Sequence, residues 1–103
     1  MLPLNELVER TEKAVETAVL WLRVLKALRR KPMCTSELRR SLNPMPHRPT
    51  VEASLFLMLG LGLVERAGKG RVKSWRLTPK GEEILERAGE HLKKQLMLIL
   101  ESP

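Results

Sequence analysis

The 103-residue sequence is poor in several residue types on which particular structures depend. Its one cysteine, Cys34, excludes an internal disulfide and a cysteine-rich zinc site. Two tryptophans, one phenylalanine and no tyrosine leave most of the packing to leucine. Asparagine and glutamine together occur three times, which is compatible with a thermophilic source. The longest apolar run, residues 53–64, has 12 residues, fewer than a membrane span needs, and no signal peptide is recognisable. We therefore expect a soluble, cytoplasmic protein.

Positive charge is abundant and unevenly placed. The chain carries 19 Lys and Arg against 12 Asp and Glu, a formal net charge of +7. Residues 23–48 hold eight basic side chains and one acidic one, and residues 66–80 hold six basic side chains and no acidic one. Charges that serve only solubility are interspersed in sign. Two basic stretches between acidic ends therefore indicate a surface that binds a polyanion. A solvated basic face without a partner is the alternative explanation.

The hydrophobic periodicity predicts a single domain over residues 1–103, mostly α-helical with a small β-hairpin. The predicted elements are, in order, helices over 4–30, 36–42 and 49–59, a hairpin over 63–77 and a helix over 79–100. Glycines between two short β-favouring runs indicate the hairpin turn. Thr35 and Thr78 are expected to cap the helices that follow them.

The two outer helices carry more apolar side chains than a domain of this size needs for its own core. The stripe along residues 4–30 is wider than a coiled-coil seam, and residues 96–100 are apolar all round. We expect these helices to join two copies of the chain into a homodimer. The residues predicted to form the dimer interface are Leu4, Leu7, Val8, Val15, Leu85, Ala88, Leu92, Leu96, Ile99 and Leu100.

Three segments of the sequence carry a family resemblance. The first is Thr-Ser-Glu-Leu at 35–38, followed by Leu42. The second runs from 50 to 66 and ends in Gly-Leu-Val-Glu-Arg, and the third is Trp-Arg-Leu-Thr-Pro-Lys-Gly at 75–81. Together they resemble the winged helix-turn-helix proteins, in particular the small prokaryotic regulators of the MarR-like and PadR-like groups. The similarity covers about residues 15–88, and the outer helices resemble the dimerisation arms of such regulators.

The resemblance implies a transcriptional regulator, a repressor in our expectation, that binds double-stranded DNA as a homodimer. Its third helix would enter the major groove, and its hairpin, the wing, would follow the backbone or the minor groove. The residues that the resemblance places against DNA are His47, Arg48, Thr50, Glu52, Ala53 and Ser54 around the third helix, and Lys69, Arg71 and Lys73 in the wing. Arg48 is suited to a bidentate contact with guanine, and Ala53 permits close approach. Arg39 and Arg40 suit phosphates, which fix position without reading sequence.

The second half of the predicted third helix departs from the family pattern, in which the outward positions are polar or basic. Here Phe56, Leu57, Leu59 and Leu61 are apolar. Either the outer helices or a partner subunit cover them, or the helix holds another protein. Two alternatives to the regulator follow: an architectural protein that binds DNA of any sequence, and a winged-helix interaction module within a larger assembly.

No motif indicates catalysis, a metal ion or a cofactor. A phosphate-binding glycine loop, a nucleophile motif and paired metal ligands are all missing from the sequence. His91 has no second histidine at metal-binding spacing, and Cys34 is explained more simply as a small loop residue than as an oxidant sensor. We therefore expect neither enzymatic activity nor a cofactor.

Overall fold

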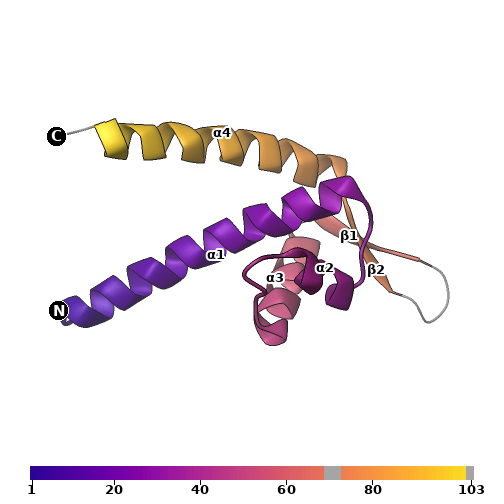
Figure 1. Cartoon of the computed structure of the whole chain (residues 1–103), viewed down its shortest axis with the longest axis horizontal. Coiled ribbons are helices and arrows are strands. Elements are labelled where there is room, and N and C mark those ends of the chain that lie inside the picture. The colour runs from indigo at the N-terminus through magenta and orange to yellow at the C-terminus, as the bar shows by residue number, and fades with distance from the viewer. Residues whose placement is uncertain (69–72, 102–103) are drawn as a thin grey trace.

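A computed structural model describes residues 1–68 and 73–101, most of which are helical (Figure 1). The elements are α1 (Leu4–Arg30), α2 (Thr35–Ser41), α3 (Arg48–Gly60), β1 (Val64–Ala67), β2 (Ser74–Leu77) and α4 (Pro79–Glu101). β1 and β2 pair in antiparallel fashion, with Val64 opposite Leu77 and Ala67 opposite Ser74. The predicted fold class, mostly α with a small hairpin, is confirmed. The helix ends lie within one residue of the predicted ones.

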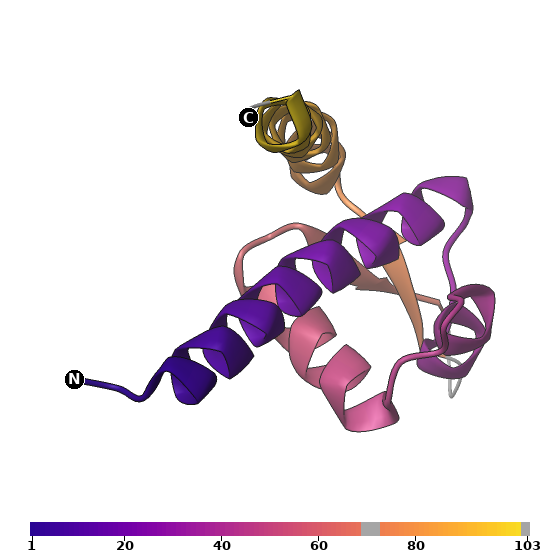
Figure 2. The same cartoon turned by 60° about the vertical axis from the view of Figure 1, so that its left-hand side comes forward.

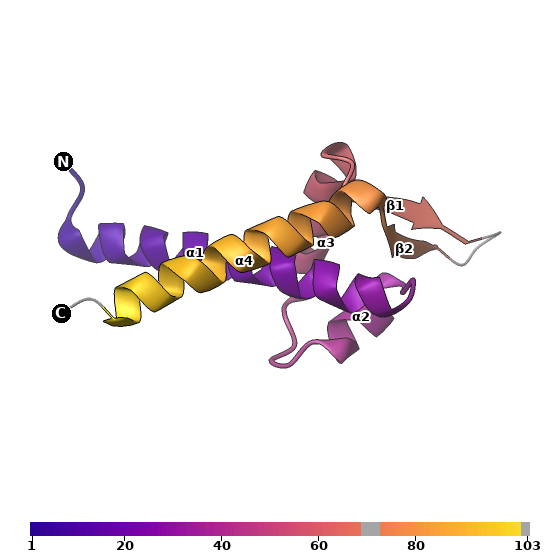
Figure 3. The same cartoon turned by 90° about the horizontal axis from the view of Figure 1, so that it is seen from above.

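The molecule is elongated because its two long helices extend beyond the core. Its principal extents are 53 × 28 × 24 Å and its radius of gyration is 15.6 Å, against about 13 Å for a compact chain of this length. α1 lies between α4 on one side and the α2–α3 pair on the other, as Figures 1 and 2 both show. The start of α1 and the end of α4 point away from the hairpin (Figure 3). We call these two projecting segments, residues 4–19 and 92–101, the arms.

The core lies where the second half of α1 meets α2, α3 and the hairpin. Leu25, Leu38, Leu55 and Met58 are at most 1% exposed. Met33, in the connection between α1 and α2, forms an antiparallel bridge with Trp75, with N···O distances of 3.1 and 2.8 Å in the two directions. This bridge adds a one-residue third strand to the hairpin and fixes it to the beginning of α2.

The two expected helix caps have different outcomes. Thr78 does cap α4, because its Oγ1 accepts a hydrogen bond from the Gly81 N–H at 3.0 Å. The expectation for Thr35 is wrong: Cys34 occupies the N-cap position of α2, and Thr35 is the first residue of the helix. The Thr35 Oγ1 instead accepts a hydrogen bond from the Trp75 indole N–H at 3.1 Å. A buried indole N–H needs an acceptor, and this contact between distant segments provides one.

The connection from the hairpin into α4 is closely packed. A Cβ atom on Gly81 would overlap the carbonyl oxygen of Leu63. Thr78 donates its hydroxyl to the Gly62 carbonyl at 2.6 Å, and the Lys80 Nζ donates to the Leu61 carbonyl at 3.0 Å. These bonds fix the start of α4 against the end of α3.

Across the described ranges, no helix has both the length and the apolar character that crossing a membrane would require.

Candidate nucleic-acid interface

α3 has one buried side and one exposed side. Val51, Leu55 and Met58 are fully buried and anchor the helix to the core. Of the residues predicted to face DNA here, His47, Arg48, Thr50 and Ala53 are exposed, and Glu52 is half-exposed.

The expectation that Ser54 faces DNA is wrong. Ser54 is 5% exposed, because it lies three residues after Val51 and four before Met58. That spacing puts it on the inward side of the helix.

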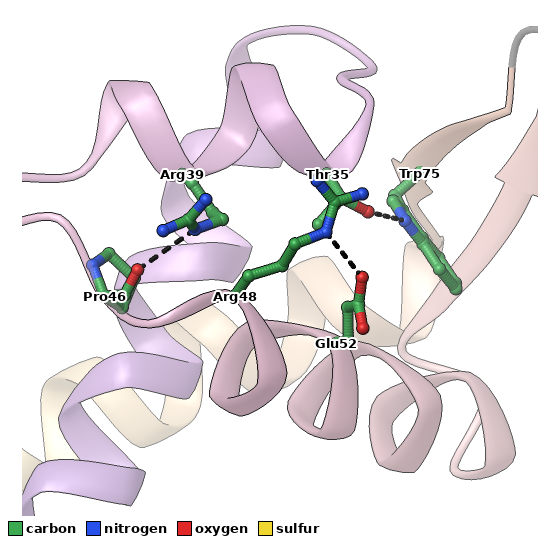
Figure 4. Close-up of polar contacts among 6 residues, drawn as sticks. All are labelled: Thr35, Arg39, Pro46, Arg48, Glu52 and Trp75. Carbon is green, nitrogen blue, oxygen red and sulfur yellow. Dashed lines mark hydrogen bonds and ion pairs between the residues drawn. The ribbon is translucent and has the colours of Figure 1, made fainter.

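At the start of the exposed side of α3, two side chains one helical turn apart form an ion pair. The Arg48 Nε donates to the Glu52 Oε1 at 2.8 Å, and the two side chains are 55% and 44% exposed. Figure 4 shows the Arg48 guanidinium rising from the start of α3 toward α2, with the Glu52 carboxylate beneath it. The bond engages Nε rather than the two terminal nitrogens.

A hollow of about 210 Å³ adjoins this ion pair, between the start of α2, the middle of α3 and the hairpin. The residues that line it are Thr35, Glu52, Phe56, Arg66, Lys73 and Trp75. The structure thus brings Lys73, a predicted wing contact, close to Glu52. The other two predicted wing contacts, Lys69 and Arg71, lie outside the described residues.

Arg66 is held at this hollow by two aromatic rings. Its guanidinium carbon lies 5.5 Å from the centre of the Phe56 ring and 5.2 Å from that of the Trp75 ring. The rings meet edge to face, with centres 5.9 Å apart. Such stacking orders a cation without neutralising it. The sequence placed Arg66 in a basic stretch, but the contact depends on the pairing of Arg66 with Trp75 across the hairpin.

The two arginines predicted to contact phosphates lie in different places. Arg39 is half-buried, and its Nε donates to the Pro46 carbonyl at 3.1 Å, which fixes α2 to the loop before α3 (Figure 4). Arg40 is exposed and lines a separate hollow with Arg30 and Lys31 at the end of α1. Arg39 therefore belongs to the same surface as Arg48, whereas Arg40 belongs to a neighbouring basic surface.

Comparison with solved structures finds this architecture in other proteins. No protein-family model matches the sequence, and no curated protein matches it significantly. Among solved structures, the transcriptional regulator BldR from Sulfolobus solfataricus superposes with a TM-score of 0.71 at 19% identity, over 100% of this chain and 88% of that one. The oxidised form of MarR from E. coli gives 0.68 at 20% identity, over 97% and 81%. A MarR family protein from Bacillus stearothermophilus gives 0.62 at 23%, over 96% and 78%.

The chain has a winged helix-turn-helix fold. Within this fold α2 and α3 form the helix-turn-helix, and β1 and β2 form the wing. The resemblance inferred from the three sequence segments is thereby confirmed at the level of the fold.

The arms of the winged helix carry most of the residues predicted to form a dimer interface. Those exposed in the single chain are Leu4, Leu7, Val8, Val15, Leu92, Leu96, Ile99 and Leu100. Leu85 is 8% exposed and belongs to the core, so the prediction that it lies in the interface is wrong. Ala88 lines an apolar groove of about 400 Å³ between α1 and α4. The Trp21 Nε1, also in this groove, is buried and has no hydrogen-bond partner among the described residues.

The outer helices of this chain do not cover the apolar second half of α3. Of the two covers expected from the sequence, the outer helices and a partner subunit, the first is therefore wrong for the residues that stay exposed. Leu57 and Leu61 are 60% and 52% exposed. Leu59 packs against the core instead, and Phe56 contacts Trp75 and Arg66. The surface patch that stays open consists of Phe56, Leu57 and Leu61.

Within residues 1–68 and 73–101, no cluster of three or more His, Cys, Asp or Glu side chains is arranged to hold a metal ion. Cys34 is half-buried and unpaired as a thiol.

Proposed function

We propose that this protein is a transcriptional regulator that binds double-stranded DNA as a homodimer and represses by occupying a promoter. The observation that carries the proposal is the exposed first half of α3, flanked by Arg39 from α2 and by Arg66 and Lys73 from the wing. Solved structures with the same winged-helix fold include the transcriptional regulators BldR and MarR.

In the proposed complex, α3 enters the major groove, which is wide enough to admit a helix. Arg48 presents its terminal nitrogens to guanine, and the Thr50 methyl group contacts thymine. The small side chain of Ala53 allows the helix backbone to approach the base edges. Arg39, Arg66 and Lys73 bind phosphates on either side and fix the position of α3 without reading the sequence.

The exposure of the arms supports the proposed homodimer. Leu4, Ile99 and Leu100 are 74%, 69% and 81% exposed, and apolar side chains gathered in this way on a surface require a cover. The arms point away from the wing (Figure 3), so pairing them leaves both copies of α3 free. Two such helices would meet successive major grooves, about 10 base pairs apart or a multiple of that spacing.

Selection of bound duplexes from a random pool tests the proposal. We expect enrichment of a two-fold symmetric sequence, bound roughly 10³-fold or more tightly than random duplex. Transcription in vitro from a promoter that overlaps the selected sequence should fall when the protein is added. Absence of any DNA binding would overturn the proposal.

A second candidate is an architectural protein that binds DNA of any sequence. It is favoured by the scarcity of base-reading side chains on α3, where Pro49, Ala53, Phe56 and Gly60 are among the exposed residues. Tight binding from a pool that stays random would support it.

A third candidate is a winged helix that docks a protein through the patch formed by Phe56, Leu57 and Leu61, all more than half exposed. A variant with Lys69, Arg71 and Lys73 replaced by neutral residues would separate it from DNA binding. Full biological activity of that variant would favour the docking function.

A further inference from the structure

Glu52 is an acidic side chain on a surface that is otherwise basic. It is bonded to Arg48, and it shares the hollow beside α3 with Arg66 and Lys73. A carboxylate here repels DNA phosphates and lowers affinity for every sequence, since the affinity of such a surface comes largely from neutralised phosphates. Its position therefore requires a role that outweighs this loss.

We propose that Glu52 determines specificity, by positioning Arg48 for guanine and by penalising binding to DNA that has adenine in place of that guanine. The proposal rests on the proposed function, because it assumes that the first half of α3 lies in the major groove. It names one base pair in each half-site as the recognised ligand.

The positioning role follows from the geometry of the ion pair. An arginine side chain has several rotatable bonds, and a free one samples many orientations. Glu52 lies one turn further along the same helix, where side chains four residues apart meet. Its 2.8 Å bond to Nε restricts the orientations of the guanidinium and leaves both terminal nitrogens as donors. Guanine presents two acceptors, O6 and N7, that match such a pair of donors.

The penalty follows from the charge of Glu52. Its side chain is 44% exposed and is paired with Arg48, so in the proposed complex the carboxylate lies beside Arg48 in the groove. A carboxylate accepts hydrogen bonds and donates none, and the bases that offer it a donor in the major groove are cytosine and adenine, through their amino groups. The partner of guanine is cytosine, so a carboxylate beside a guanine-binding arginine meets a donor. At a G·C pair both side chains are satisfied, whereas with adenine in place of guanine the carboxylate faces the O4 acceptor of thymine and Arg48 faces the adenine amino group. Specificity thus arises from repulsion of the wrong sequence as well as attraction of the right one.

The test compares four variants by fluorescence anisotropy on three duplexes. The duplexes are the sequence selected by the unaltered protein, the same sequence with the recognised G·C pair changed to A·T, and a random sequence. The variants are Arg48→Ala, Glu52→Ala, Glu52→Gln and the control Glu83→Gln. Glu83 forms the same kind of pair with Arg87, four residues apart at 2.9 Å, but on α4. Each variant should melt within roughly 4 °C of the unaltered protein, because exposed pairs contribute little to stability.

We expect the unaltered protein and Glu83→Gln to prefer G·C over A·T by about 10- to 100-fold, the range of a good bidentate contact. Arg48→Ala should abolish this preference, and Glu52→Ala should reduce it to about threefold or less. Glu52→Gln should raise affinity for random duplex by up to about fivefold for each subunit of the dimer, the range of one exposed charge interaction, and more than Glu83→Gln does.

Two outcomes overturn the inference while the proposed function stands. The first is an unchanged preference for G·C in Glu52→Ala when Arg48→Ala loses it. The second is a Glu52→Gln variant whose affinity rises equally on the selected and the random duplex. If the unaltered protein binds none of the duplexes, the proposed function fails, and the role of Glu52 fails with it.

Discussion

The two halves of α1 have the same apolar periodicity and opposite surroundings. In the second half Val24, Leu25 and Leu28 are at most 2% exposed, whereas in the first half Leu4 and Val15 are 74% and 57% exposed. The apolar stripe of α1 therefore packs in the core of its own chain along the second half of the helix and is exposed along the first half. Periodicity specifies which side of a helix needs cover, but it does not specify which molecule provides that cover. Substitutions in the core and in the arms test this difference.

The largest effect is expected at Leu25, which is 1% exposed in the core. Leu25→Ala should lower the free energy of unfolding by about 2–5 kcal/mol through lost contacts and a cavity. The melting temperature should fall by at least roughly 8 °C at every protein concentration. The arm substitution Val15→Ala should instead lower the melting temperature by an amount that depends on protein concentration. This is expected for a residue that a second subunit covers, because the covering subunit is present only in the dimer. Differential scanning calorimetry at several concentrations distinguishes the two; a concentration-independent effect at Val15 would contradict the arm assignment.

The next effect is expected at the start of α4. Gly81→Ala should destabilise the protein by about 1–3 kcal/mol, because the added methyl group overlaps the Leu63 carbonyl oxygen. Gly89 is the matched control further along the same helix, where an added Cβ meets nothing within 4 Å. Gly89→Ala should stabilise by roughly 0.5–1 kcal/mol, because alanine favours helices. Urea unfolding followed by circular dichroism measures both, and equal signs for the two changes would disprove the close packing at Gly81.

A smaller effect, on the free energy of dimerisation, is expected at the end of α4. Leu96→Asp places a charge on an arm side chain that is 48% exposed in the single chain. Burying that charge in a dimer should raise the dissociation constant at least about tenfold, or roughly 1.4 kcal/mol. Light scattering at micromolar concentration should then show a folded monomer. Leu57→Asp, at a comparably exposed apolar position on α3, should leave the dimer intact; dissociation by both substitutions would show that the arms are not the specific interface.

The smallest effect is expected at the wing. Lys73→Ala should weaken binding to all DNA sequences about equally and reduce the slope of log affinity against log salt by about 1.8, since each subunit of the dimer loses one phosphate contact. Lys26→Ala removes the same charge from α1, in a hollow formed with α4, and should leave the slope unchanged. Anisotropy titrations at four salt concentrations give both slopes. A sequence-dependent loss at Lys73 would mean that it reads bases.

The sequence predicted well what depends on neighbours along the chain. Helix ends came within one residue of the observed ones, because proline, glycine and threonine act locally, as Thr78 does at the start of α4. The side of α3 that is buried was also predictable, from Leu55 and Met58.

Contacts between distant segments were not predictable in the same way. Thr35 accepts a hydrogen bond from Trp75, 40 residues away, and does not cap its own helix. Leu85 lies on the apolar stripe of α4 that continues into residues 92–101, yet its side chain is buried in the core. To predict the stacking of Arg66 on Trp75, one would need to know the register of the hairpin. To predict the Arg48–Glu52 ion pair, one would need to know the side-chain rotamers. Local signals specified the elements, and packing decided the role of the individual side chains.

The two tryptophans lie in different parts of the molecule, so their fluorescence can report separately on the wing and on the two long helices. Trp75 contacts Thr35, Phe56 and Arg66 beside α3, whereas Trp21 lines the groove between α1 and α4. Indole emission shifts with the polarity around the ring, so a Trp21→Phe variant would report events at the wing and a Trp75→Phe variant events between the long helices. Each process could then be followed in real time without an attached dye.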